Sequence, residues 1–301
     1  MPAKPVEIEW PTLALLCATY IAWALGTVLW AESAVFSLIL TGVAIAQYSS
    51  LQHEALHDHP FRNRLLNEAL VFASFSLFVP YRRFRDTHLQ HHHDPSLTDP
   101  YDDPESNYCD PAVWPQLPRP LQLALRFNNM LLGRILLGPL IGTYNFLAKD
   151  LSLIGKGDHD VRVAWALNLI GLMPVGIWLH WVGMPIFGYL GAVYLGLALL
   201  KIRSFLEHRA HETARARTVV VEDRGPLSLL FLNNNFHAVH HMHPKVAWYK
   251  LPALYAARRA HYLSRNEDYV YKNYGQVFRR YFMRAKDPVP HPLWPMVKDD
   301  S

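Results

Sequence analysis

Histidines dominate the residues of this sequence that could do chemistry. Most of the 17 histidines lie in four short clusters, at residues 53–59, 88–93, 208–211 and 237–243. The first cluster reads His53-Glu54-x-x-His57, which places two imidazoles one helical turn apart. This spacing suits two alternatives. One is the zinc site of HExxH peptidases, in which the glutamate activates water, and the other is part of a larger iron-binding histidine array.

The second and third clusters favour the larger array. His88, His91 and His92 stand at positions i, i+3 and i+4, a spacing that brings three imidazoles to one face of a helix. The cluster at residues 237–243 repeats this spacing with His237, His240 and His241, and we call it the third cluster because residues 208–211 do not have this spacing. With the first pair these clusters supply eight imidazoles, too many for one tetrahedral zinc. Neutral imidazole also suits iron and copper, and two metal ions fit the number.

The peptidase alternative leaves most of these histidines without a function. Its first pair needs one further ligand, which an Asp on a distant helix would supply in an intramembrane zinc peptidase. Residues 163–200 contain no Asp. We therefore prefer the histidine array, in which Glu54 holds an imidazole in its metal-binding tautomer.

Four uncharged stretches must position these clusters. Hydrophobic residues make up 51% of the sequence and charged residues 18%, which is apolar for a soluble protein. Each stretch is long enough to span a bilayer, and together they form two hairpins. The predicted spanning helices cover about residues 12–30, 33–52, 163–182 and 185–205.

Two further apolar stretches are expected not to span the membrane. Residues 65–80 are too few for a complete crossing, so we predict an interfacial or re-entrant segment. A crossing there would place the first two histidine clusters on opposite sides. Residues 131–148 are interrupted by Gly133, Arg134, Gly138 and Pro139, and we predict a membrane-surface element.

The distribution of basic residues orients the chain. Residues 31–61 and 163–200 contain no Lys or Arg, whereas the segments that hold the histidines are rich in arginine. The positive-inside rule then places both termini and all four clusters in the cytoplasm, for which we expect a bacterial inner membrane. The predicted fold is a single all-α integral membrane domain, residues 1–301. A cytosolic helical cap, about residues 53–160 and 206–301, would hold a histidine-rich di-metal site.

The order HxxxH, HxxHH, HxxHH, together with two transmembrane hairpins, resembles the membrane fatty-acid desaturase and hydroxylase superfamily. The resemblance covers about residues 40–255 and includes HAVHHMHP at 237–244, followed by WYKLP at 248–252. This tail looks most like bacterial fatty-acid desaturases and also like carotenoid ketolases. The resemblance implies one more histidine at the cytoplasmic end of the fourth helix, for which His208 is the candidate and His211 the substitute.

Nine metal ligands follow from the resemblance, with no catalytic residue apart from them. His59, His93 and His243 are left outside this set, although His93 would replace His91 if the second cluster were read as HxxxHH. The predicted ligands are His53, His57, His88, His91, His92, His208, His237, His240 and His241.

The resemblance also implies the reaction. Two ferrous ions, reduced by an external donor, would use O2 to remove hydrogen from an unactivated C–H bond of a lipid. We expect fatty acyl desaturation in lipid metabolism. The alternatives are a carotenoid ketolase or hydroxylase, an alkane or fatty-acid hydroxylase, and, without catalysis, a membrane metal carrier or sensor.

The electron donor is expected to be a separate protein. The sequence has no His-Pro-Gly-Gly motif of a fused cytochrome b5-like domain, and its two cysteines, Cys17 and Cys109, cannot form a ferredoxin-like set. We predict a ferredoxin that docks on the arginine-rich face. The net charge of +4 does not suggest nucleic-acid binding.

Two polar stretches flank the second and third clusters. In residues 94–105 we expect the Asp-Pro steps to build turns, and the alternative is that one or two carboxylates accept a hydrogen bond from a ligand imidazole. One of Asn233, Asn234 and Asn235 could reach a metal through water. In some relatives an Asn one turn before the isolated histidine does this, but here Ser204 occupies that position.

Overall fold

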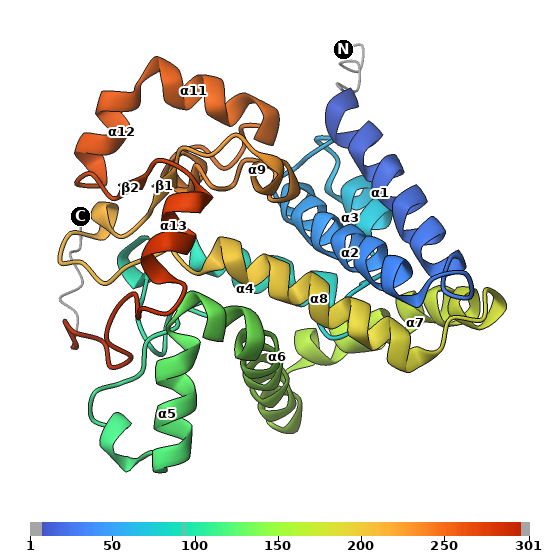
Figure 1. The fold of residues 1–301 in the computed structure, drawn as a ribbon, viewed down its shortest axis with the longest axis horizontal. Helices are drawn as coiled ribbons and strands as arrows, with labels where there is room; N and C mark the ends of the chain where they lie inside the picture. The colour runs from blue at the N-terminus through green and yellow to red at the C-terminus, as the bar shows by residue number, and fades with distance from the viewer. Residues whose placement is uncertain (1–7, 93, 296–301) are drawn as a thin grey trace. The chain divides into compact units, whose positions relative to one another are not determined.

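Helices make up nearly all of the regular structure (Figure 1). The computed structural model describes residues 8–92 and 94–295. The longer helices are α1 (Trp10–Val28), α2 (Ala34–Leu56), α4 (Tyr81–His91), α5 (Arg119–Asn128), α6 (Leu131–Gly155), α7 (His159–Trp181) and α8 (Ile186–Ser204). The shorter helices are α3 (Arg64–Val71), α9 (Pro226–Leu230), α10 (His237–Met242), α11 (Leu251–Ala257), α12 (Arg259–Arg265) and α13 (Tyr274–Tyr281). The remaining elements are the strands β1 (Val220–Val221) and β2 (Val270–Tyr271) and the 3-10 turns Asp94–Ser96, Trp114–Gln116, Ala214–Ala216 and Trp248–Lys250.

The chain divides into two compact units. The first unit comprises Met1–Arg85 and Gly142–Leu199, and the second comprises Asp86–Ile141 and Leu200–Ser301. Helices α4, α6 and α8 each contribute residues to both units.

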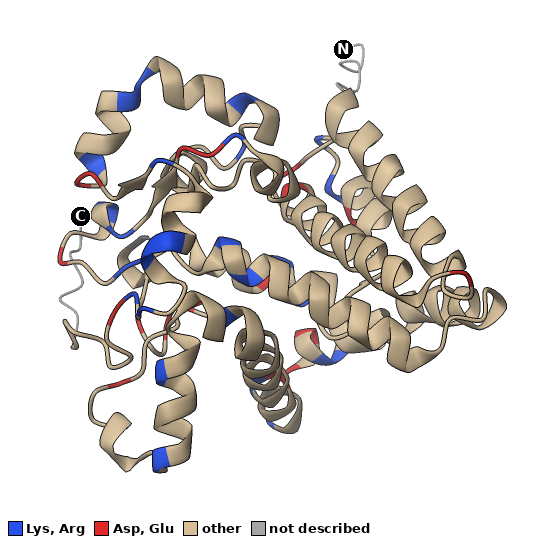
Figure 2. Ribbon diagram, viewed as in Figure 1, with Lys and Arg blue, Asp and Glu red and all other residues tan. Residues whose placement is uncertain are grey.

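Within the described residues, five helices are long and apolar enough to cross a membrane: α1, α2, α6, α7 and α8. They carry few charges along their lengths, whereas Lys and Arg gather on the elements of the second unit (Figure 2). Their outward side chains include Trp181 and Phe187, which are 75% and 84% exposed. Such surfaces are stable against lipid and not against water, so this is a multi-pass membrane protein.

The predicted spanning helices agree with α1, α2, α7 and α8 to within a few residues. Ser33 begins α2 by accepting a hydrogen bond from the Phe36 N–H, and Asp158 begins α7 in the same way through the Val161 N–H. Gly183 turns the chain between α7 and α8 at φ 72°, a conformation that favours glycine. Gly26 lets α1 approach α2, because a Cβ there would lie 2.5 Å from Thr41 Oγ1.

Helix α6 is the main departure from the sequence analysis. Where we expected an interrupted surface element there is one continuous helix of 25 residues, so the count of four spanning helices is not confirmed. Gly133 does not break α6 but fits it against the carbonyl of Phe127, only 1.8 Å from where a Cβ would lie. The buried Arg134 donates to the Asn128 carbonyl and to Asn107 Oδ1, so its charged head is satisfied inside the protein.

Residues 65–80 form no spanning helix. Helix α3 contains 8 residues, and the chain is non-helical from there to Pro80. Asn63 begins α3 by accepting hydrogen bonds from Leu65 and Leu66. A helix of this length cannot cross a bilayer, which agrees with the expectation of an incomplete crossing.

Aromatic side chains fill the interior of the first unit. Phe75 stacks on Trp23 of α1 and on Tyr48 of α2, with ring centroids 4.3 and 4.2 Å apart. Tyr189 of α8 accepts a hydrogen bond from Trp23 Nε1 at 3.1 Å and donates to the Phe75 carbonyl at 2.8 Å. These polar atoms are paired with one another, so aromatic bulk is buried without an unsatisfied donor.

A buried ion pair joins α4 to α6 within the first unit. The guanidinium of Arg83 makes a bidentate contact with Asp150, at 3.0 Å from Nε and 2.8 Å from Nη2. Trp165 of α7 donates to the same carboxylate at 2.8 Å. The Asp150 side chain is 1% exposed, so α4, α6 and α7 meet at one fully desolvated charge.

The second unit has its own small core. Strands β1 and β2 pair in parallel, with Val220 opposite Val270. Val220 packs with Phe236, Val239 and Tyr262, which join β1, α10 and α12 in one buried cluster. This core holds α10, the helix of the third histidine cluster, on a rigid support.

Candidate metal centre

The histidine clusters lie at element ends that the core holds in place. The second cluster occupies the end of α4 and the residue after it, and the third forms α10. His208 follows α8 by four residues and pairs with Thr218 in an isolated bridge. His53 and His57 lie at the end of α2.

Four histidines of the second unit converge in one group. Their ligand nitrogens lie within 4.8 Å of one another. The Nε2 atom of His208 lies 2.8 Å from Nε2 of His91 and 3.1 Å from Nε2 of His237. The His241 ring completes the group, with its centroid 4.6 Å from that of His237. We call His91, His208, His237 and His241 the four-histidine cluster.

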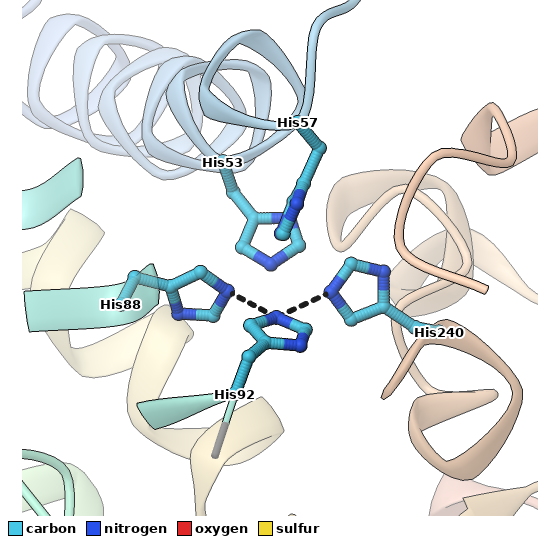
Figure 3. A group of neighbouring side chains, drawn as sticks. All are labelled: His53, His57, His88, His92 and His240. Carbon is cyan, nitrogen blue, oxygen red and sulfur yellow. Dashed lines mark hydrogen bonds between the residues drawn. The ribbon is translucent and has the colours of Figure 1, made fainter. Parts of the chain in front are cut away.

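Three other histidines of the second unit form a separate group. Nε2 of His92 lies 2.9 Å from Nε2 of His88 and 3.2 Å from Nε2 of His240, the two contacts dashed in Figure 3. The His92 and His240 rings approach edge to face at 4.9 Å. We call His88, His92 and His240 the three-histidine cluster.

His53 and His57 form a pair in the first unit. Their rings project from the last turn of α2 (Figure 3), with centroids 5.0 Å apart, and both side chains are buried. Glu54 is also buried, with a carboxylate oxygen 3.8 Å from Nδ1 of His53. The spacing expected from the sequence is therefore present on the helix.

The second and third sequence clusters divide their histidines by the same rule. Each gives its i, i+4 pair to one spatial group and its i+3 residue to the other. Thus His88 and His92 meet His240, while His237 and His241 meet His91. Each HxxHH sequence therefore contributes histidines to both groups. We had expected all three of its imidazoles to lie on one face of the helix.

Side chains behind the imidazoles accept hydrogen bonds from their Nδ1 atoms. Asp103 lies 2.7 Å from Nδ1 of His91, and Glu105 lies 2.9 Å from Nδ1 of His88. The carboxylates of the 94–105 stretch thus do more than build turns, contrary to our preference. Asp103 has both roles, because it also accepts from the N–H groups of Thr98 and Glu105.

Asn234 supports the third cluster in the same way. Its Oδ1 lies 3.0 Å from Nδ1 of His237. Asn234 is one of the three asparagines that we considered for a water-mediated metal contact. It instead makes a direct hydrogen bond with the His237 imidazole.

Charge in this region favours a bound cation. Burial alone would lower the pKa of His91, but Glu105 and Asp103 outweigh it and raise this pKa to about 9. Burial opposes ionisation of Glu105, yet the imidazoles of His91 and His88 lower its pKa. The buried Asp103 and the partly exposed Glu105 therefore favour positive charge at the imidazoles in front of them.

The imidazoles of His208 and His237 are held neutral. Burial lowers the pKa of His208 and of His237 well below the ordinary value, and the neighbouring imidazoles lower both further. Neutral imidazole is the form that binds a metal.

A metal cation fits this donor set. A carboxylate only accepts hydrogen bonds, so Nδ1 of His88 and of His91 carries a proton, and Nε2 is the nitrogen that can bind a metal once it is deprotonated. Several Nε2 atoms then face one another at 2.8–3.2 Å. Such short contacts are favourable with a proton or a metal ion between the nitrogens, and imidazole nitrogen is a ligand of iron, zinc and copper.

The other histidines of these segments point elsewhere. His211 accepts a hydrogen bond from the Thr213 N–H and lies 3.4 Å from Glu267, outside both clusters. His59 pairs with Glu9 at 2.9 Å, and the His243 ring lies 6.1 Å from that of Tyr262. His93, the alternative to His91, lies outside the described residues.

Comparison with known proteins adds an independent observation. The sequence model of the family described as "Fatty acid desaturase" matches residues 29–273, which include every histidine of the clusters above. No curated protein matches the chain.

Proposed function

The chain belongs to the fatty acid desaturase family, and on that basis we propose that this membrane oxidoreductase uses two iron ions to desaturate a fatty acyl chain. In this reaction two hydrogens leave adjacent carbons. Dioxygen accepts them together with two electrons and two protons from outside, giving an alkene and two waters. The observation that carries the proposal is the convergence of Nε2 atoms in two separate groups.

We propose that the four-histidine cluster binds one ion and that the three-histidine cluster, completed by His53 and His57, binds the other. The i, i+4 spacing, burial and adjacent Glu54 of that pair support its assignment. Two iron ions, when bound and reduced, supply the power to activate dioxygen and remove hydrogen from an unactivated carbon. Asp103, Glu105 and Asn234 hold protons on Nδ1 atoms and so fix which nitrogen faces the ions.

The test is a product profile. We expect that expressing the chain in a host that makes both saturated lipids and carotene will introduce new double bonds into the acyl pool. The runner-up functions, carotenoid ketolase or hydroxylase and alkane or fatty-acid hydroxylase, predict new oxygen in those substrates instead. Unchanged acyl chains beside oxygenated carotenoids would overturn the proposal. A metal carrier or sensor would release metal reversibly and consume no O2 with reduced ferredoxin.

We propose that a reduced ferredoxin docks at a hollow of the second unit that reaches a candidate ligand. His241 is partly exposed there, whereas His237 and His240 are buried. The exposed Arg215 and Arg265 give this hollow a basic rim that suits an acidic partner. The lining residues are Arg215, Thr218, Ala238, His241, Met242, Tyr262, Arg265 and Asn266.

Reversing the charge of this rim tests the docking site. The double variant Arg215→Glu, Arg265→Glu should lower the ferredoxin-supported rate by about tenfold or more at low salt, because attraction becomes repulsion. The dithionite-supported rate should stay unchanged. Arg119→Glu at the exposed start of α5 is the matched control. Equal loss with both reductants, or none with ferredoxin, would contradict the docking site.

We propose that four of the five apolar helices cross the membrane, with both termini and all clusters in the cytoplasm of a bacterium. Of the five apolar helices, only α6, α7 and α8 lie between His91 and His208, and those two rings are 4.6 Å apart. Three crossings would place the two histidines on opposite sides of the membrane, so an even number is required. We assign the two crossings to α7 and α8, which the short turn at Gly183 joins into a hairpin. The positive-inside rule supports the cytoplasmic orientation.

Labelling should distinguish these topologies. Cysteine labels at residues 31–32 and 183–184 should react from outside, and labels at residues 62, 120, 157 and 220 should not, because four crossings leave those positions in the cytoplasm. External reactivity at residue 157 would mean that α6 crosses, and at residue 120 that residues 65–80 do. We further propose that residues 1–301 act as one domain, since the family match spans both units.

A further inference from the structure

We propose that residues 282–295, the C-terminal strap, position His91 and His208 and thereby retain iron in the four-histidine cluster. This inference rests on the proposed function. The strap follows the last residue of the family match and contributes no residue to either cluster. Its bonds nevertheless lead to two of the four ligands by separate routes.

The first route ends on the backbone of His208. The ammonium of Lys286 donates to the His208 carbonyl, and its side chain is only 11% exposed. The Asp287 carboxylate lies 3.4 Å from the same ammonium and accepts a hydrogen bond from the Tyr108 hydroxyl at 2.6 Å. That hydroxyl accepts from the Ala210 N–H at 2.9 Å. His208 lies beyond the end of α8, so these bonds fix a segment that no helix holds.

The second route ends on the imidazole of His91. The Leu293 N–H donates to Nδ1 of His291, so the proton of this ring lies on Nε2. Nε2 lies 3.2 Å from the Thr98 hydroxyl and donates to it. The Thr98 N–H donates to Asp103 at 2.9 Å, and Asp103 faces Nδ1 of His91 at 2.7 Å. His291 and Thr98 are 2% and 1% exposed, so water does not replace these bonds.

The strap is itself firmly attached to the second unit. Cys109 exchanges two backbone hydrogen bonds with it, receiving from His291 and donating to Val289, each at 2.9 Å. Asn129, which follows α5, accepts from the Lys286 N–H at 3.0 Å and donates to the Asp287 carbonyl. These bonds are made by Lys286, by His291 and by the residues between them. The strap therefore holds both side chains in fixed positions.

Both routes lead to ligands of the four-histidine cluster. Removing them should therefore speed the release of iron from that cluster and not from the other site. Groups that orient a metal ligand typically change metal affinity by about 10–100-fold when removed. In Lys286→Met, His291→Phe, iron should leave one site about 10–100-fold faster under a chelator, while release from the other site stays unchanged. Iron per chain should fall from two towards one.

Matched controls separate positioning from general loosening. Lys272→Met and His261→Phe make the same changes at exposed positions of the second unit and should release both irons as the wild-type protein does. Lys286→Arg and His291→Gln keep an N–H donor at each route and should restore slow release. Should the double variant fail to fold, Tyr108→Phe, which removes one hydroxyl, should show the same selective release to a smaller degree.

The outcomes are distinguishable from failure of the proposed function. A wild-type protein that binds no iron would overturn that function and this inference together. A wild-type protein with two irons, beside strap variants that keep both or lose both equally, would overturn the inference alone.

Discussion

Replacing His240 with alanine should abolish lipid oxidation and leave the protein folded. His240 is 2% exposed, and its Nε2 lies 3.2 Å from that of His92 in the three-histidine cluster. Loss of a group that only orients a ligand already costs about 10–100-fold, so loss of a proposed ligand should cost at least about 100-fold. The new double bonds in the acyl pool should disappear, and metal analysis of anaerobically purified protein should find less iron than in the wild type.

His243→Ala is the control for this variant. It removes an imidazole three residues away on the same segment, but one that lies beside Tyr262 rather than in a cluster. We expect it to retain most of the activity and both irons. Full activity in His240→Ala, or a single zinc and no iron in the wild-type protein, would contradict the di-iron proposal.

Asp150→Ala should destabilise the protein by about 3–5 kcal/mol, the usual cost of removing one partner of a buried ion pair. Asp150 is the bidentate acceptor of Arg83 and also accepts from Trp165, at a position 1% exposed. The variant leaves a largely buried guanidinium in place after its acceptor has gone. Thermal or denaturant unfolding in detergent measures the change.

Asp160→Ala provides the comparison for that measurement. The Asp160 side chain is 97% exposed at the start of α7, so its removal should change the free energy of unfolding by no more than about 0.5 kcal/mol. An equal loss in both variants would show that the Arg83–Asp150 pair contributes nothing specific.

The sequence was most informative where local spacing determines structure. Uncharged stretches of membrane length predicted α1, α2, α7 and α8, because hydropathy and helix length are local properties. The spacing of the histidines likewise predicted the i, i+4 pairs, since His88 stays with His92 and His237 with His241, but it did not predict that the i+3 histidine joins the other group. Helix α6 was missed because Gly133 and Arg134, which suggest a break, are accommodated by the carbonyls of Phe127 and Asn128.

The division of histidines between two groups depends on contacts distant in sequence. His91 joins His208 and His237, which lie more than a hundred residues further along the chain. The spacing of residues within one helix cannot predict which distant histidines His91 will contact. The roles of Asp103 and Glu105 had a weak signal, namely carboxylates soon after the second cluster, but the Asp-Pro turns there gave an equally good reason for them.

The strap also sets an order of events during protein synthesis. His91 and Asp103 leave the ribosome long before His291, which the chain reaches 200 residues later. At about 5–20 residues per second, this interval lasts about 10–40 s, enough for the apolar helices to enter the membrane first. The four-histidine cluster therefore gains the supports of the strap only after the apolar helices have been made, and the iron loading that we propose would follow that step.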